Sequence, residues 1–215
     1  SRIGGEGADL ITTSATTSDP SKKYLALSDD EKSVLQAMKD GPFAKRILLV
    51  NTLNAIELGF LDEYNIDACL QIGGPGEAGL DAVIDILVGT TNPSGKLIDT
   101  YAYDSFSSPA MQNFGDYKWP NKDALNSSTL QTYLVYSEGI YVGYKYYETR
   151  YEDTVLNRGS AASKAGVYAS KDNWNYSEEV QFPFGYGLSY TTFTQTLNSV
   201  NVNEKAKTAT VSVTV

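Results

Sequence analysis

The 215-residue sequence predicts an α/β fold with a largely parallel sheet flanked by helices, which is an α/β sandwich. Two short apolar runs, residues 47–50 and 67–72, have the length and composition of strands buried on both faces. Segments with helical periodicity precede the first run and follow the second. Strands and helices that alternate through short links are typical of a parallel sheet with helices on its faces.

The first helix is expected over about residues 29–40. Ser28 precedes it and Glu31 lies three positions later, which is the pattern of a capping box. Apolar residues recur within this segment at helical spacing, and Gly41-Pro42 is expected to end the helix. A second helix is expected around residues 55–63, between the two strands.

A third helix is expected from Glu77 to Leu87, because its apolar residues form one stripe and Gly89 provides a stop. From about residue 100 to 180 the chain is rich in Tyr, Asn, Ser and Gly and its periodicity is weak. That composition predicts long loops with short strands. Residues 208–215 alternate with period two, which predicts a strand.

Composition excludes several classes of function. The net charge of −9 argues against a nucleic-acid partner, because binding a phosphate backbone requires a basic face. No apolar run approaches the ~18 residues of a membrane span, so no membrane partner is expected. The chain contains no histidine, which excludes a Ser-His-Asp triad, an HExxH zinc site and a histidine general base. We expect no metal or other cofactor, and the sequence leaves a secreted and a cytoplasmic location both open.

A single carboxylate, Glu6, lies among glycines near the start of the sequence. Three glycines within four positions let the backbone make tight turns and come close to a ligand. A lone Glu on such a loop is suited to act as a general acid. The same eight residues also fit an ordinary surface turn.

The glycine pattern at residues 74–79 matches G-x-G-x-x-G, follows an expected strand and opens an expected helix, and Asp99 lies 20 residues beyond it. These are the conditions of a dinucleotide-binding fingerprint. However, Glu77 would put negative charge at the helix N-terminus where a pyrophosphate docks, whereas that charge is favourable for the helix itself. We therefore interpret the pattern as a structural turn and keep a dinucleotide-binding domain as the remote alternative.

Five short motifs follow one another along the chain: RIGGEGAD at 2–9, GPGEAG at 74–79, NPSGKL at 92–97, EGIYVGYKYY at 138–147 and FPFGYGLSYTTF at 182–193. In this order and at these distances they resemble the motifs of glycoside hydrolase family 3, the β-glucosidase and β-xylosidase group. The resemblance covers roughly residues 1–195. We interpret residues 138–147 and 184–187 as structural, because glycines between aromatic residues usually mark close backbone packing. The alternative is that some of their tyrosines line an outer sugar subsite.

The resemblance implies a retaining, exo-acting β-glycosidase that releases terminal β-linked glucose or xylose from oligosaccharides or glycosides. It implies that Glu6 is the acid/base and that the nucleophile is an Asp on a β/α barrel. No SDW-like motif for that Asp occurs in this sequence, so the chain is expected to be a fragment whose partner is the missing barrel. The barrel could either precede or follow this chain. The fragment alone is then expected to be inactive.

The resemblance also implies two domains: an α/β sandwich over residues 1–194, incomplete at its N-terminus, and the first strands of a fibronectin type III-like β-sandwich over residues 195–215. Trp174 and Trp119 are the candidates for an outer sugar subsite, with ordinary packing as the alternative for both. The competing hypothesis for the whole chain is a non-catalytic carbohydrate-binding or architectural module in which Glu6 is incidental.

Overall fold

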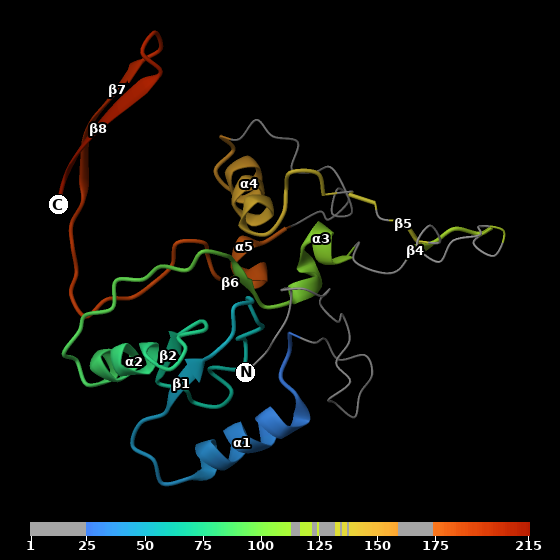
Figure 1. Cartoon of the computed structure of the whole chain (residues 1–215), viewed down its shortest axis with the longest axis vertical. Coiled ribbons are helices and arrows are strands. Elements are labelled where there is room, and N and C mark those ends of the chain that lie inside the picture. Colours follow the sequence, from blue (N-terminus) through green and yellow to red (C-terminus); the bar gives the residue numbers. More distant parts are fainter. Residues whose placement is uncertain are drawn as a thin grey trace. The chain divides into compact units, whose positions relative to one another are not determined.

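The computed structural model describes residues 25–112, 117–121, 124, 132–133, 135–136, 138–158 and 174–215. The chain divides into two compact units (Figure 1). Unit 1 comprises Ser1–Glu77 and Lys96–Tyr186, and unit 2 comprises Ala78–Gly95 and Gly187–Val215.

Each unit has its own helices and strands. Unit 1 contains α1 (Asp29–Asp40), β1 (Ile47–Val50), β2 (Ala68–Gln71), β3 (Tyr101–Ala102), the 3₁₀ helix η1 (Ser105–Ser107), α3 (Pro109–Gln112), β4 (Tyr117–Lys118), β5 (Thr132–Tyr133), α4 (Tyr144–Thr154), α5 (Tyr176–Glu179) and β6 (Val180–Phe182). Unit 2 contains α2 (Gly79–Leu87), β7 (Thr196–Asn203) and β8 (Thr208–Thr214).

Helix α1 forms as the sequence predicts. The backbone N–H of Glu31 donates to the Ser28 hydroxyl over 3.2 Å, and the Glu31 carboxylate accepts from the Ser28 backbone N–H over 2.8 Å. This reciprocal pair is the predicted capping box. The acidic residues of the first turn are also favourable beside the positive end of the helix dipole.

Strands β1 and β2 pair in parallel, with Ile47 opposite Ala68 and Val50 opposite Gln71. The other three strand pairs in the described residues, β3–β6, β4–β5 and β7–β8, are antiparallel and two-stranded. The predicted mixture of helices and strands is therefore present. A largely parallel sheet is not confirmed, because the described residues contain only one parallel pair.

The prediction that both faces of these strands are buried is wrong for the described structure. Val50 is buried in a core cluster with Leu58, Leu61 and Tyr101. On the opposite face of β1, Ile47 and Leu49 retain 47% and 41% exposure. The apolar run predicted a strand correctly, but composition does not reveal which face of a strand is covered.

The helix expected around residues 55–63 does not form. Residues 59–65 make a series of turns, with Leu61 N–H donating to the Leu58 carbonyl and Ile66 N–H to the Leu61 carbonyl. Glycine is a poor helix former, and Gly59 lies at the start of this stretch. Only the bond from Tyr64 N–H to the Phe60 carbonyl spans the four residues of a regular helix, whereas the bonds donated by Leu61, Asn65 and Ile66 span three, three and five residues.

An 11-residue helix, α4, lies within the stretch that was predicted to consist of loops and short strands. Its buried side chains are Tyr146, Tyr147 and Arg150. Two of these are aromatic residues with polar hydroxyls and one is charged, so a hydrophobic stripe does not mark the buried face. Tyr146 and Tyr147 pack with Ala102 and Val180 in a second core cluster. The short strands expected in this stretch do occur, as β3 to β6.

In unit 2, α2 begins at Gly79 rather than at Glu77, and its N-cap is Ala78, which makes no side-chain capping bond. The helix ends as predicted beside Gly89, which has φ +81°. The predicted strand at the end of the chain is β8, which forms an antiparallel hairpin with β7 (Figure 1). The domain limits 1–194 and 195–215 remain a prediction. None of the helices in the described ranges has the length and apolar content needed to span a bilayer.

Candidate functional site

Glu6, the predicted acid/base, lies outside the described residues, together with the rest of its motif. The structure therefore provides geometry for the other four motifs and for the two tryptophans. No group of three or more His, Cys, Asp or Glu side chains among the described residues is arranged as a metal site.

Three of the motifs, or their immediate neighbours, meet in unit 1. Leu97 exchanges two backbone hydrogen bonds with the FPFGYG segment: its N–H donates to the Tyr186 carbonyl and its carbonyl accepts from Gly185 N–H, each over 2.8 Å. The rings of Tyr144 and Phe184 stack with centroids 4.2 Å apart and planes at 21°. We call this region, residues 97–99, 143–144 and 184–186, the motif junction.

Gly143 of the junction is the N-cap of α4, with φ 57° and ψ −133°. Side chains rarely tolerate this backbone conformation. A Cβ on Gly143 would also lie 3.1 Å from Oδ1 of Asp99. That carboxylate oxygen accepts from Thr100 N–H over 2.8 Å, and its position beside the helix N-terminus is electrostatically favourable. Burial, together with the negative charge of Asp99, raises the pKa of Tyr101 to about 12.

Replacing Gly143 by Ala is therefore expected to lower the free energy of unfolding by about 3 kcal/mol, as judged by urea denaturation. The matched control is Gly139→Ala, because Gly139 has the same φ of 57° but no atom of a described residue within 4 Å of its Cβ position. The control should lose about 1 kcal/mol, from backbone strain alone. Equal losses in the two variants would show that the contact with Asp99 contributes nothing.

In unit 2, the NPSG and GLSY segments are joined by side-chain hydrogen bonds. Oδ1 of Asn92 accepts from the Ser189 hydroxyl over 3.0 Å and from Tyr190 N–H over 2.8 Å. The Tyr190 hydroxyl donates to the carbonyl of Ile86, at the end of α2, over 2.7 Å. The polar residues of these motifs thus join distant parts of the sequence within unit 2.

The glycine turn at 74–79 contains a second position, after Gly143, where the backbone has a positive φ. Gly76 has φ +64°, and no described residue places an atom within 4 Å of the position its Cβ would take. The positive φ of the backbone, rather than contact with a described side chain, is therefore what favours glycine here. Asp99, which a dinucleotide fingerprint would use on a ribose, lies beside Gly143 in the motif junction.

Replacing Gly76 by Ala is expected to lower the free energy of unfolding by about 1 kcal/mol, because Ala is strained at positive φ. Gly95 is the control, since its Cβ position is equally open but its φ lies outside the positive range. Gly95→Ala should be neutral or slightly stabilising. Calorimetry should detect no NAD or NADP binding by the parent chain or by Gly76→Ala. An NADP affinity that disappears in Gly76→Ala would instead support the dinucleotide-binding alternative.

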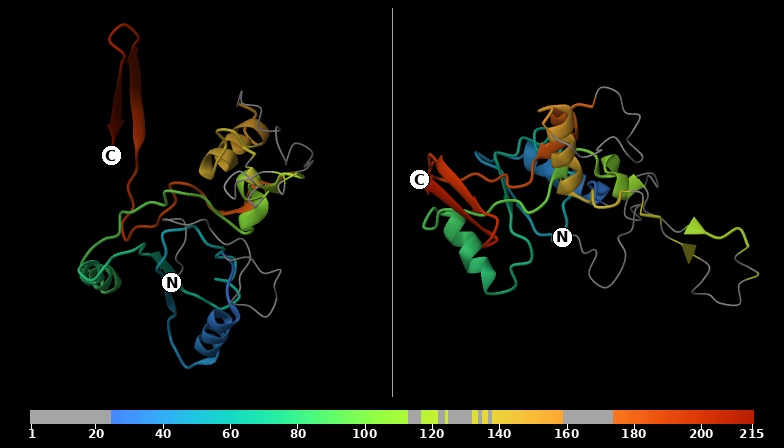
Figure 2. Two further views of the ribbon diagram at one scale, coloured as in Figure 1. Left: turned by 45° about the vertical axis from the view of Figure 1, so that its right-hand side comes forward. Right: turned by 90° about the horizontal axis from the view of Figure 1, so that it is seen from above.

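Trp174 belongs to a buried polar cluster between α4, the gold helix of Figure 2, and α5. The two helices are in contact, since the rings of Tyr151 and Tyr176 lie 4.7 Å apart. The guanidinium of Arg150, a residue only 3% exposed, lies 4.8 Å from the centroid of the Trp174 ring. The indole N–H donates to the Glu179 carboxylate, and Arg150 donates to the Tyr146 hydroxyl. Trp174 thus has one ring face and its N–H in internal contacts. Its role in a sugar subsite remains a prediction.

The sequence analysis did not identify Arg150. The signal that could have found it is the spacing of four between Tyr146 and Arg150, which puts an aromatic ring and a cation on the same face of a helix. Next to this pair, the Tyr176 hydroxyl donates to the Glu148 carboxylate over 2.7 Å. Burial and this negatively charged neighbour raise the pKa of Tyr176 far above its usual value.

Trp119, in contrast, is 46% exposed and follows β4 directly. Its ring lies 4.6 Å from that of Tyr133 on β5, and the Tyr133 ring lies 5.6 Å from that of Tyr117. These three residues form a row of aromatic rings on the β4–β5 hairpin. The prediction that Trp119 contacts sugar is not tested by these contacts.

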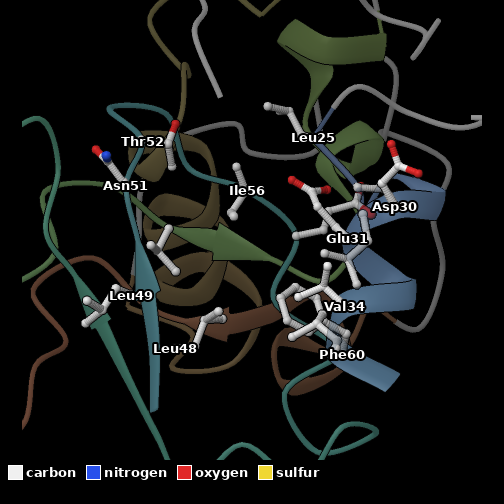
Figure 3. Close-up of a pocket in the computed structure, with 15 residues that line it drawn as sticks. Leu25, Asp30, Glu31, Val34, Leu48, Leu49, Asn51, Thr52, Ile56 and Phe60 are labelled. Atoms are coloured by element: carbon white, nitrogen blue, oxygen red, sulfur yellow. The ribbon is translucent and has the colours of Figure 1, made fainter. Parts of the chain in front are cut away.

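A cavity of about 340 Å³ lies between α1 and β1. Leu48 of β1 and Val34 of α1 face it from opposite sides, and the carboxylates of Asp30 and Glu31 lie on the α1 side (Figure 3). Most of the lining is apolar, whereas a site that orients a polar ligand presents several convergent polar groups. The Glu31 carboxylate already accepts a hydrogen bond in the capping box. We therefore assign no sugar site to this cavity.

Comparison with known proteins gives consistent matches. A profile of the glycosyl hydrolase family 3 C-terminal domain matches residues 4–144. The chain is 35% identical over 170 residues to a β-glucosidase of Ruminococcus albus, a match that covers 79% of this chain and 14% of that protein. It is 36% identical over 141 residues to β-glucosidase B of Emericella nidulans, covering 65% of this chain and 13% of that protein.

Among solved structures, a β-glucosidase from Paenibacillus barengoltzii aligns with a TM-score of 0.56 and 29% identity, covering 81% of this chain and 15% of that one. The chain thus spans only 13–14% of the length of these two curated relatives.

Proposed function

This chain belongs to the glycosyl hydrolase family 3 C-terminal domain family, and from that premise we propose that it forms part of a retaining, exo-acting β-glycosidase. The enzyme would hydrolyse terminal β-linked glucose or xylose from oligosaccharides or glycosides. The observation that carries the proposal is the extent of the family match, which begins at residue 4 and therefore includes the glycine loop around Glu6. The three similar proteins named above are β-glucosidases, and their names support glucosides as the substrate class.

In this proposal Glu6 is the acid/base. It protonates the glycosidic oxygen in the first step and activates water in the second. A retaining enzyme requires a second carboxylate about 5–5.5 Å away, which attacks the anomeric carbon. That nucleophile would be an Asp on a β/α barrel outside this chain. A partly dry cleft and the neighbouring carboxylate would raise the pKa of Glu6 enough for it to donate a proton near neutral pH.

The described residues would serve as the scaffold that positions Glu6, the one catalytic carboxylate that this chain is proposed to supply. The motif junction and the Asn92 hydrogen bonds hold three family motifs in place. A rigid scaffold is what a catalytic loop needs, because a small displacement of an acid/base group costs much of its contribution. The chain would in this way position Glu6 and supply one wall of the substrate pocket.

The stereochemistry of the reaction tests this proposal. A polypeptide that carries both this chain and the barrel should hydrolyse aryl β-glucosides or β-xylosides and release the β-anomer first, as observed by proton NMR during the first minutes. Initial release of the α-anomer would contradict a retaining mechanism. Absence of hydrolysis on every β-glycoside tried would favour the competing hypothesis of a non-catalytic carbohydrate-binding or architectural module.

A further inference from the structure

The β4–β5 hairpin carries a row of aromatic side chains that the proposed chemistry does not use. Tyr117 and Tyr133 lie directly opposite each other in the antiparallel pair. Trp119 lies two positions beyond Tyr117, and neighbouring side chains of an extended strand alternate between its faces. Tyr117 and Trp119 therefore share one face with Tyr133, and Lys118 is directed to the other. We call these three rings the hairpin platform.

The rings of the platform follow one another closely. The centroid distances are 5.6 Å from Tyr117 to Tyr133 and 4.6 Å from Tyr133 to Trp119, with planes tilted by 33° and 38°. Among the described residues, two residues of each strand pair in this hairpin. A ladder of that length is marginal in water, so the ring contacts add to the interactions that hold the platform in shape.

The exposed end of the platform is the indole of Trp119, at 46% exposure. Unlike Trp174, whose ring lies under the Arg150 guanidinium, Trp119 has no cation–π contact among the described residues. A broad, rigid and uncharged aromatic face suits a neutral ligand that has a flat apolar side and polar edges. A pyranose ring has this form, with C–H groups on its face and hydroxyls at its rim.

Charge supports the same type of ligand. The chain carries a net charge of −9, which disfavours acidic polymers, and the single cation on the paired strands, Lys118, is directed away from the rings. We propose that the hairpin platform is a binding site for a neutral β-linked oligosaccharide, with Trp119 stacking on one pyranose ring. The inference rests on the proposed function, which supplies such chains as substrates, and it adds Tyr133 and Tyr117 as the residues that position the indole.

The first test measures binding without catalysis. The 215-residue chain is titrated with S-linked cellotetraose, whose thioglycosidic bonds resist hydrolysis, and saturation-transfer NMR follows the sugar protons. Trp119→Ala should weaken binding about tenfold or more, the effect expected for loss of one stacking contact. Tyr136→Ala is the matched control, since Tyr136 lies close in sequence and is 75% exposed but has no ring contact among the described residues. It should bind as tightly as the parent chain.

Two further variants separate stacking from folding. Trp119→Phe keeps a flat ring and should restore part of the lost affinity. Tyr133→Leu keeps an apolar side chain but removes the ring that supports the indole, and should weaken binding several-fold. Equal affinity of the parent chain and Trp119→Ala, or no detectable binding by the parent chain, would overturn the platform. Neither result bears on Glu6 chemistry, which the stereochemical experiment tests separately.

The length of the sugar substrate gives a second readout in a polypeptide that also carries the barrel. Trp119→Ala should raise KM for cellotetraose about tenfold and raise KM for 4-nitrophenyl glucoside much less, because the tetrasaccharide extends further beyond the cleaved bond than the aryl group does. An equal change on both substrates would overturn the assignment, since it would indicate a general effect on the enzyme.

Discussion

Glu6→Ala, in a polypeptide that carries this chain and the barrel, is expected to reduce hydrolysis of cellobiose or an alkyl glucoside by about 10²–10⁴-fold, the usual contribution of general acid–base catalysis. The loss should be largest for poor leaving groups, because these require protonation as the glycosidic bond breaks. Dinitrophenyl glucoside needs little protonation, so its first step should proceed and the glycosyl-enzyme should accumulate. Burst kinetics and mass spectrometry would detect that intermediate.

Azide provides the diagnostic rescue for the same variant. Deglycosylation of Glu6→Ala lacks a base to activate water, whereas azide attacks without one. Added azide should restore turnover of dinitrophenyl glucoside and give a β-glycosyl azide. Asp9→Ala serves as the control, since Asp9 is the next carboxylate in the same motif and should show no azide effect. If Glu6→Ala slows good and poor leaving groups equally and azide changes nothing, the acid/base is Asp9 or a carboxylate outside this chain.

The second large effect is the absence of activity in the chain by itself. Without the barrel, the purified 215-residue chain should not hydrolyse aryl β-glucosides above the rate in buffer. Holding two reacting groups in the correct orientation supplies about 7–11 kcal/mol of a typical barrier, and here one of the two groups is missing.

A matched variant distinguishes true turnover from contamination in that experiment. Glu6→Ala is purified in parallel and assayed under the same conditions. Residual activity that is equal in both preparations originates from a host glycosidase. Activity that is present in the parent chain and lost in Glu6→Ala would contradict the proposal that the site is divided between two domains.

Local signals in the sequence predicted several elements correctly. The cap, the first-turn charges and the stop of helix α1 all lie within residues 28–41, so the limits of the helix follow from local sequence. The same holds for β1 and β2, whose apolar runs identified both strands and their parallel pairing. The family motifs are local as well, and the family they indicated is the one that the profile confirms.

Elements that depend on tertiary packing were predicted less well. Residues 59–65 form turns in which most backbone hydrogen bonds do not have helical spacing, while Leu58 and Leu61 are buried in the core. Helix α4 was missed because its buried face consists of tyrosines and an arginine, which hydrophobic periodicity does not register as core. The guanidinium of buried Arg150 contacts Trp174 and Tyr146, and Trp174 is brought to it by the fold.

The sequence by itself determined the family, the position of the candidate acid/base within a glycine loop, and the exclusion of histidine-based chemistry, since each follows from residue identity and short spacing. The tertiary structure decided which residues meet across long separations. It brought Asp99 against Gly143, Phe184 against Tyr144, and Tyr133 against Trp119. The physical reason is that such contacts depend on how the whole chain closes upon itself, and no local propensity or periodicity records that closure.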